Sequence, residues 1–221
     1  MHVEWYGQSA FSLSDGSTTV FIDPFATMTA AADRGIRWDY PAIGDVDADL
    51  LLVTHEHLDH NGVEAVGGDP VTLRSVVGHL ESPVGEVLGV ASEHDEVAGT
   101  DRGVNTMFVF HLAGRRVAHL GDLGQRALRE EQLAALGSVD LLFVPVGGGP
   151  TIGASRPRRS RPPWARASSC RCTTRPSAST SFSPWTSSSA RARVERLASP
   201  AFDLSALRAG ETPVVIVPAA P

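Results

Sequence analysis

Lysine is absent from the sequence, and cysteine occurs only twice, as Cys170 and Cys172. All 19 basic residues are therefore Arg, a bias that suggests a GC-rich genome. The two cysteines lie together in one unusual segment and indicate no redox compartment. Every apolar run is shorter than the roughly 18 residues that span a bilayer, and the opening Met1–Trp5 lacks a basic leader region. We therefore expect a soluble, cytoplasmic protein without a membrane partner.

Positive charge is scarce in the first part of the chain. Residues 1–150 hold eight Arg against 22 Asp and Glu, a net charge of −14, whereas the whole chain of 221 residues carries −6. An acidic body argues against nucleic acid as a partner. The length and the 42% hydrophobic content suit a single domain over residues 1–221. No feature of the sequence indicates an oligomeric state.

Short apolar runs alternate with turn signals over the first 150 residues, a pattern typical of a strand-rich α/β domain. The continuous apolar run Asp49–Thr54 predicts a strand buried on both faces. Leucines near helical spacing in Gln125–Leu136, with Gly137 as a stop, predict a helix. The other predicted strands are His2–Tyr6, Ala10–Ser14, Thr18–Ile22, Met107–Leu112, Arg115–Leu120, Val139–Val146 and Pro213–Val217.

Aliphatic residues are missing from Ser155–Ala190, which contains no Val, Ile, Leu or Met. Acidic residues are also missing between Asp140 and Glu195, an interval that holds nine Arg. Such a composition lacks the side chains that bury a core face. Two explanations fit: a disordered Arg/Ser/Pro-rich linker, or a stretch translated out of frame between two compensating shifts.

The genetic code favours the second explanation. When the third base of each codon is joined to the first two bases of the next, Trp164-Ala165 reads as Gly and Ala167–Cys170 reads as aliphatic codons or Phe. Ser169–Thr174 then reads as an apolar residue, Pro or Ser, a second apolar residue, His or Tyr, and a polar or aromatic residue. The shifted reading thus contains a small-residue helix, a Gly, an apolar strand and a P-x-H-like sequence.

Four side chains that can bind a metal follow the predicted strand Asp49–Thr54 within six residues: His55, His57, Asp59 and His60. Alternation places His55 and His57 on the same side of an extended backbone, so two imidazoles can converge on one ion. Asp59 and His60, in the following loop, can reach a second ion. A polar loop with incidental histidines is the alternative, which four ligands directly after a buried strand disfavour. Imidazole with carboxylate suits Zn, Fe, Mn or Ni.

This H-x-H-x-D-H run is similar to the signature of the metallo-β-lactamase superfamily. W-Y-G-Q-S-A-F at Trp5–Phe11 and F-I-D-P-F at Phe21–Phe25 resemble the opening of its lactonase-like and phosphodiesterase-like branch, which includes ascorbate-6-phosphate lactonase. S-E-H-D-E and R-G-V-N-T-M-F, within Ser92–Phe108, resemble the part that supplies a third histidine ligand. H-L-G-D-L-G, at His119–Gly124, resembles the motif whose aspartate bridges two metals. The likeness covers about residues 1–152.

The resemblance implies an α/β protein built as a four-layer αββα sandwich, with two mixed sheets face to face and helices outside. It implies a metal-dependent hydrolase that directs an activated water at an ester, lactone or phosphodiester-type small molecule. One or two divalent transition-metal ions would be bound, with Zn favoured over Mn, Fe and Ni. Asp59 is then the catalytic residue that orients or deprotonates the water. The implied metal ligands are His55, His57, Asp59, His60, His94 and Asp122.

Several of these residues have simpler roles available. Considered without its motif, His94 is typical of a surface or helix-capping histidine. Asp122, which lies near Gly121 and Gly124, is typical of a turn residue. Asp23, before Pro24, is predicted to be a turn residue or to orient a ligand. His119 is a candidate for the same orienting role. His2, His79 and His111 are expected to be structural.

One element of the family pattern is missing. The pattern ends with a further histidine after a C-terminal strand, and the sequence has none after His119. The shifted reading places it where Cys172 and Thr173 stand. Its loss takes a neutral ligand from the second metal, so the alternative function is a non-catalytic or degenerate metal-binding protein. A metal-dependent nuclease is disfavoured by the acidic body.

Reading codons 155–190 in the alternative frame is expected to raise the melting temperature, add a second metal equivalent and raise hydrolase activity together. Each restored core aliphatic side chain contributes about 1.5–3 kcal/mol, against a total stability of about 5–15 kcal/mol for a typical domain. Calorimetry, elemental analysis and hydrolase assays measure the three effects. If restoring the frame changes none of them, the segment is native and the proposed final ligand is wrong.

Overall fold

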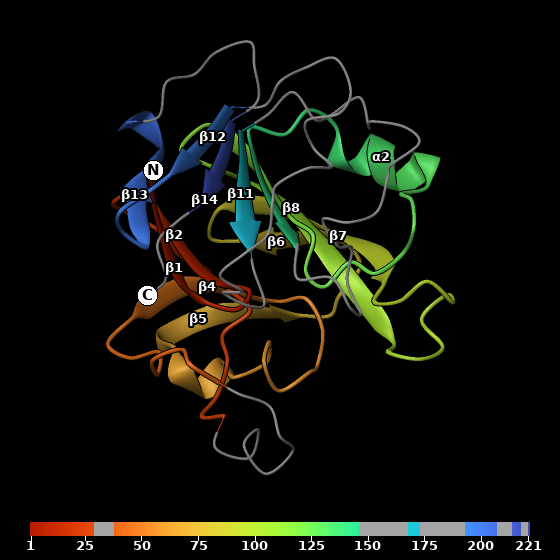
Figure 1. The fold of residues 1–221 in the computed structure, drawn as a ribbon, viewed down its shortest axis with the longest axis horizontal. Coiled ribbons are helices and arrows are strands. Elements are labelled where there is room, and N and C mark those ends of the chain that lie inside the picture. The colour runs from red at the N-terminus through yellow and green to blue at the C-terminus, as the bar shows by residue number, and fades with distance from the viewer. Residues whose placement is uncertain (29–37, 146–167, 173–192, 207–213, 218–220) are drawn as a thin grey trace.

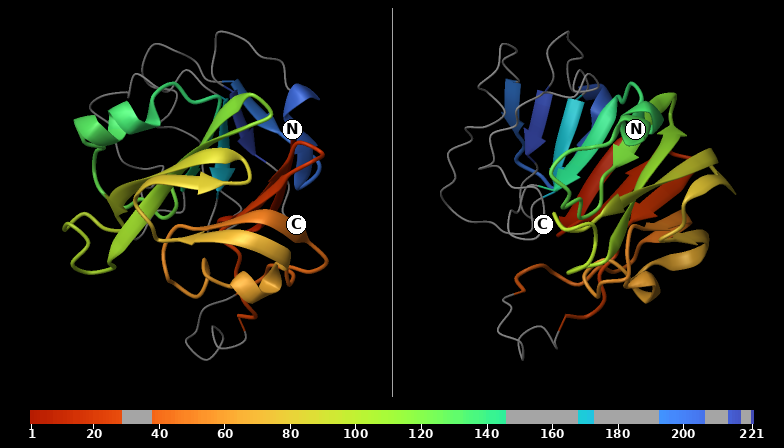
Figure 2. Two further views of the ribbon diagram at one scale, coloured as in Figure 1. Left: turned by 180° about the vertical axis from the view of Figure 1, so that it is seen from behind. Right: turned by 90° about the vertical axis from the view of Figure 1, so that its right-hand side faces the viewer.

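The computed structural model describes residues 1–28, 38–145, 168–172, 193–206, 214–217 and 221. Its strands form two mixed sheets, of six and eight strands, that pack face to face (Figures 1 and 2). This is the sheet arrangement expected of a metallo-β-lactamase-type αββα sandwich. Among the described residues, none of the helices has the length and apolar character that crossing a membrane requires.

The first sheet begins with an antiparallel meander and continues with two parallel strands. Asp15 closes the second turn of the meander, since its carboxylate accepts the backbone N–H groups of Ser17 and Thr18, both at 2.9 Å. In spatial order the sheet is β13-β1-β2-β3-β4-β5. The bounds are β13 Ala201–Asp203, β1 His2–Gly7, β2 Ala10–Ser14, β3 Thr19–Ile22, β4 Asp47–Val53 and β5 Gly67–Arg74.

The second sheet joins antiparallel hairpins to a parallel set, in the order β12-β14-β11-β10-β9-β8-β7-β6. Its hairpin strands are β6 Gly78–Ser82, β7 Gly85–Glu93, β8 Val104–Leu112 and β9 Arg115–His119. Its remaining strands are β10 Leu141–Pro145, β11 Ser168–Cys172, β14 Val214–Val217 and β12 Arg193–Arg196. The described helices are η1 Val63–Ala65, α2 Glu130–Leu136 and η2 Leu204–Ala206.

The core between the sheets is built from large apolar side chains that alternate along the strands. Phe11 on β2 and Phe143 on β10 meet across the interface, with ring centroids 4.5 Å apart. The opposite face of the second sheet, including Met107 and Val109, packs against Leu136 of α2. The outer face of the first sheet is covered by Phe25, Ile43 and neighbouring loop residues. The sheets therefore bury apolar side chains on both faces.

The predicted helix Gln125–Leu136 begins five residues later than expected. Arg129 has an extended backbone and forms the N-cap, because the Gln132 side chain accepts the Arg129 backbone N–H. Gln125 instead uses its side chain to bind Gln132 and the carbonyl of Ala127. The first residues of the predicted helix thus form a loop before α2, and side-chain hydrogen bonds hold this loop in place.

One strand lies inside the aliphatic-poor segment Ser155–Ala190. β11 pairs in parallel with β10 on one side and β14 on the other, with Phe143 opposite Cys170 and Pro145 opposite Cys172. Backbone groups make this ladder, so it does not require aliphatic side chains. The rest of the segment lies outside the described residues, and the disordered and out-of-frame explanations stay predictions.

The contact between Phe11 and Phe143 gives a direct test of the sandwich. Phe11→Ala is expected to lower the free energy of unfolding by about 3–5 kcal/mol, because it leaves a cavity between the sheets. Val77→Ala is the control, since Val77 is 58% exposed and its loss changes stability by no more than about 0.5 kcal/mol. Denaturant titrations measure both. Equal effects would place Phe11 outside the core.

Candidate metal centre

The histidine-rich run begins where β4 ends. The ladder of the first sheet continues past the strands, because Asp23 donates its N–H to Leu52 and Ser75 donates to Val53, at 2.9 and 2.8 Å. After Thr54 the chain turns, and the N–H of His60 bonds the carbonyl of His57 at 2.9 Å. This turn returns the His60 ring to His55, with ring centroids 4.1 Å apart. A buried strand followed by a tight turn thus gathers the imidazoles.

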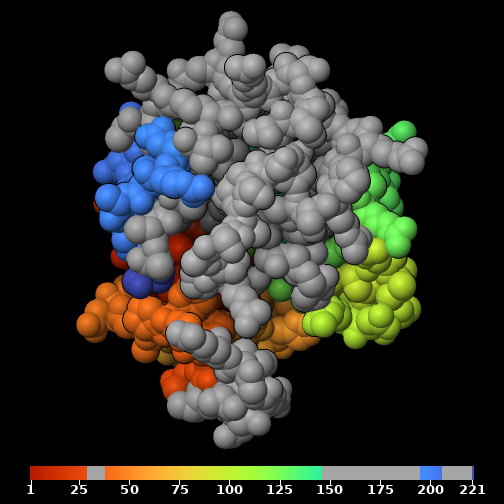
Figure 3. Space-filling model, viewed as in Figure 1, coloured from red at the N-terminus to blue at the C-terminus, as the bar shows by residue number. Residues whose placement is uncertain are grey.

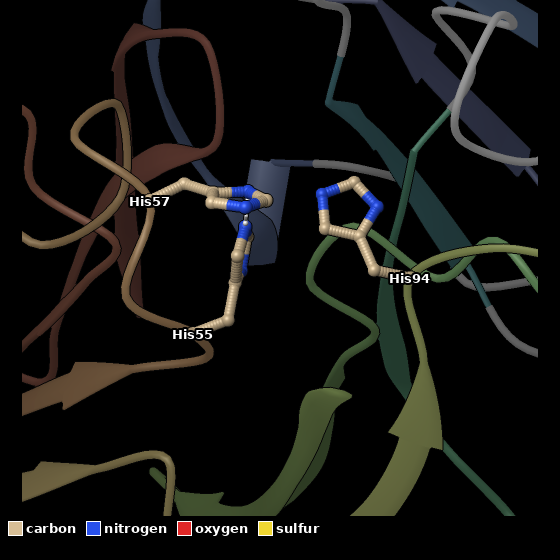
Figure 4. Close-up of side chains that lie close together, drawn as sticks. All are labelled: His55, His57 and His94. Atoms are coloured by element: carbon tan, nitrogen blue, oxygen red, sulfur yellow. Dashed lines mark hydrogen bonds between the residues drawn. The ribbon is translucent and has the colours of Figure 1, made fainter. Parts of the chain in front are cut away.

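Three imidazoles from both sheets form the first cluster. His55 and His57 follow β4 of the first sheet, and His94 follows β7 of the second. His55 Nε2 lies 2.9 Å from His57 Nδ1, and one nitrogen of each ring lies within 4.8 Å of the others. Figure 4 shows the rings of His55 and His57 facing that of His94 across a small gap. Three converging imidazole nitrogens are the donor set of a catalytic zinc-type site with an open position.

A second cluster shares His55 and adds His60 and Asp122, all three buried. Asp122 Oδ2 lies 3.5 Å from His60 Nε2 and 3.4 Å from His94 Nε2. Asp122 therefore lies between the two clusters, the position that the resemblance implies for a bridging carboxylate.

Buried polar atoms without partners show that these residues fit a metal. Within the described part of the chain, His60 Nε2, His94 Nδ1 and Asp122 Oδ1 are buried and accept or donate no hydrogen bond. Leaving such atoms unpaired costs about 1–3 kcal/mol each. A cation between the clusters would satisfy the lone pairs of a carboxylate and of neutral imidazoles together.

The electrostatics of the cluster favour that donor set. Burial and the neighbouring His60 lower the pKa of His55 to about 2, and burial also lowers the pKa of His57. Burial acts to raise the pKa of Asp122, but His60 outweighs it and holds this pKa below its usual value. At neutral pH, His55 and His57 are therefore neutral imidazoles and Asp122 is an ionised carboxylate.

His60 lies between two carboxylates. Burial acts to lower its pKa, but Asp122 and Asp23 raise that pKa well above the usual value. Positive charge is therefore favoured at the point where His60 meets Asp122, which is also where the second cluster would hold a cation.

Asp23 fixes the orientation of His60. Its carboxylate is fully buried and accepts the backbone N–H of Thr54 at 2.7 Å and the Thr54 hydroxyl at 2.8 Å. Its Oδ2 also lies 2.9 Å from His60 Nδ1. A hydrogen on Nδ1 leaves Nε2, which faces Asp122, as the nitrogen that a metal ion would bind in place of its proton. The turn residue predicted to orient a ligand thus has the geometry for that role.

Asn105 braces the loop that carries Asp122. Its side-chain amide donates to Ser92 Oγ at 2.8 Å and to the Leu120 carbonyl at 2.9 Å, and its oxygen accepts the Asp122 N–H at 3.0 Å. Gly121 has φ +53°, and a Cβ there would lie 2.3 Å from the Asn105 oxygen. The R-G-V-N-T motif, through Asn105, therefore contacts the H-L-G-D-L-G motif directly.

Asp95 organises the connection after His94. Its two oxygens accept the backbone N–H groups of Val97, Gly99, Asp101 and Arg102, at 2.7–3.0 Å. Burial acts to raise the pKa of Asp95, but these donors lower it. The connection reaches the surface in Figure 3, coloured yellow-green. Val97 in the connection and Val104 at the start of β8 are exposed.

Five of the six expected ligands come together in the two clusters, and Asp59 lies beside them. Asp59 Oδ2 is 3.8 Å from His60 Nε2, and its side chain is 32% exposed. His119 Nδ1 accepts the Gly121 N–H at 3.0 Å, and its ring packs against Phe11 and Phe143. Its Nε2 is also buried without a hydrogen-bond partner among the described residues, and an orienting role for His119 stays a prediction. His2, His79 and His111 are exposed.

Sequence reasoning missed two residues near the centre, Gln8 and Asn105. Both lie inside motifs that carried the family resemblance, and that position was the only indication in the sequence that they have a role at the centre. Their contacts, to Asp59 and to Asp122, join segments distant in the chain.

Asp23→Asn is expected to weaken metal binding by about 10–100-fold, because the amide cannot accept from both Thr54 and His60 as the carboxylate does. Asp49→Asn is a matched control, since Asp49 also accepts a backbone N–H from the neighbouring strand, that of Thr19 at 2.8 Å, at an exposed position. Zinc titration by calorimetry compares them. Equal affinities in the two variants would show that Asp23 does not orient His60.

A family model described as "Beta-lactamase superfamily domain" matches residues 2–157. The UPF0173 metal-dependent hydrolase of Thermus thermophilus is 30% identical over 175 residues, covering 69% of this chain and 74% of that protein. A UPF0173 protein of Pyrococcus furiosus is 30% identical over 164 residues, covering 67% and 71%.

Solved structures agree on the fold. A Thermotoga maritima member of the metallo-β-lactamase superfamily has a TM-score of 0.68 and 24% identity, over 99% of both chains. An isothiocyanate hydrolase from Delia radicum gut bacteria has a TM-score of 0.54 and 14% identity, over 78% of this chain and 84% of that one. With this fold and the family match, the chain belongs to the β-lactamase superfamily, in the UPF0173 group of metal-dependent hydrolases.

Proposed function

We propose that the protein hydrolyses a small-molecule ester, lactone or phosphodiester with the help of one or two divalent transition-metal ions. The observation that carries this proposal is the pair of ligand clusters that share His55 and are joined by Asp122. The unpaired buried atoms of His60, His94 and Asp122 point to a cation rather than to internal hydrogen bonds.

When bound, a divalent ion would supply Lewis acidity, which would lower the pKa of a water molecule to about 7 and stabilise negative charge on the substrate. His55, His57 and His94 would hold the ion through ring nitrogens, and Asp122 would supply negative charge between the clusters. Asp59, which is partly exposed beside His60, can accept a proton from the attacking water at its carboxylate. This division of roles matches hydrolysis at a carbonyl or phosphoryl centre.

Zinc is the metal we favour. The ligands are imidazoles and carboxylates, which also suit Mn, Fe and Ni. The second cluster, with Asp59 beside it, has His60 as the imidazole ligand that it does not share with the first cluster. The final histidine of the family pattern is missing from the sequence after His119, so the number of bound metals depends on residues 155–190. A cytoplasmic location and the absence of a nucleic-acid partner remain predictions.

A degenerate, non-catalytic metal-binding protein is the second candidate. Two observations favour it: the missing final histidine, and the end of the family match at residue 157, where the aliphatic-poor segment has just begun. Such a protein would bind metal through the first cluster and hydrolyse nothing. Metal-dependent turnover of generic lactone, thioester or phosphodiester substrates separates the two candidates.

The double variant His55→Ala, His57→Ala is expected to lose bound metal and all metal-dependent hydrolysis, because only one imidazole of the first cluster remains. His79→Ala is the matched control, since the His79 side chain is 70% exposed on β6. Elemental analysis of the purified proteins gives the metal content. An unchanged metal content in the double variant would overturn the assignment of the first cluster.

A further inference from the structure

Gln8 occupies a strained turn between β1 and β2. Gly7 has φ +110° and Gln8 has φ +51°, and the register of the two strands shifts at this point. The Tyr40 ring packs on Gly7 so closely that a Cβ would lie 2.4 Å from it. A side chain at a left-handed position costs free energy that a glycine would not. The presence of Gln8 there indicates that its side chain has a use.

The turn holds Gln8 firmly and aims its amide at the metal centre. Trp5 donates its indole N–H to the Gln8 carbonyl at 3.0 Å, which fixes the backbone. The Gln8 residue is only 5% exposed, and its Nε2 donates to Asp59 Oδ2 at 2.7 Å. Asp59 Oδ2 is the same oxygen that lies 3.8 Å from His60 Nε2. One contact therefore links a rigid turn of the first sheet to the catalytic carboxylate proposed above.

We propose that Gln8 is the positioning residue for Asp59. Its amide occupies one lone pair of Oδ2 and holds the carboxylate beside His60, where the remaining lone pairs are available to a cation or a water. A neutral donor suits this task, because it leaves the negative charge of Asp59 intact, whereas Arg or Lys would neutralise it and repel a cation. This inference rests on the proposed function.

The test is a zinc titration of the full chain by calorimetry, combined with a double-mutant cycle between Gln8 and Asp59. Gln8→Met keeps the length of the side chain and removes the donor, and is expected to weaken zinc binding by about 10–100-fold, as loss of a ligand's hydrogen-bond partner does. In an Asp59→Asn background the same substitution is expected to change the affinity by less than about 2-fold, because coupled residues are not additive.

Two further variants separate positioning from folding. Gln8→Gly removes the donor and relieves the backbone strain, so it is expected to weaken zinc binding without destabilising the turn. Gln132→Met removes a buried glutamine amide away from the ligands, where it donates to the Ala91 carbonyl at 2.6 Å. It is expected to lower the melting temperature and to leave zinc affinity unchanged.

The positioning role would be overturned if both Gln8 variants bound zinc with wild-type affinity. It would also be overturned if Gln8→Met reduced zinc affinity equally with and without the Asp59 carboxylate. Failure of the proposed function shows differently, since the unmodified chain would then show no zinc-dependent hydrolysis, whether or not it binds zinc. In activity assays the positioning role predicts a fall in kcat with KM little changed, because Asp59 acts on water rather than on substrate binding.

Discussion

The buried carboxylate of Asp23 is the point on which the centre depends. It lies just past the end of β3 and accepts both the N–H and the hydroxyl of Thr54, just past the end of β4. The same group contacts His60, six residues further along the chain. Three contacts to one fully buried side chain thus fix where the histidine-rich run begins and how its last imidazole faces. A charge placed so deeply is tolerated because each of its oxygens is paired.

The two sheets are joined at the centre by backbone as well as by core packing. Thr106 on β8 donates its N–H to the Thr54 carbonyl at 2.9 Å, which links the second sheet to the first beside the ligands. His94 and Asp122 come from the second sheet, and the other clustered histidines come from the first. Correct ligand distances therefore require that the interface containing Phe11 and Phe143 is correctly packed. Small errors in that packing would separate the imidazoles of the first cluster.

Local features of this fold could be predicted from the sequence, and tertiary ones could not. β4 and the following histidines are recognisable because a buried strand is apolar throughout and its ligands are adjacent. β5, β6 and β7 were missed, since β5 and β6 contain no buried residue and β7 alternates irregularly. Backbone pairing of β5 with β4, of β7 with β8 and of β6 with β7 holds these strands, and such pairing leaves little trace in side-chain periodicity. The contact between Gln8 and Asp59 joins residues 51 positions apart in the sequence, so it can be recognised only in the folded structure.

The pairing of β1 with β13 has a consequence for the synthesis of the protein. His2, Val3 and Glu4 pair with Asp203, Phe202 and Ala201, at nearly opposite ends of the chain. Strand β1 therefore leaves the ribosome long before the partner that covers its outer edge. Until then that edge offers unpaired backbone groups to any other nascent chain, as edge strands do. The meander formed with β2 can assemble early, but the first sheet is completed only when β13 has emerged.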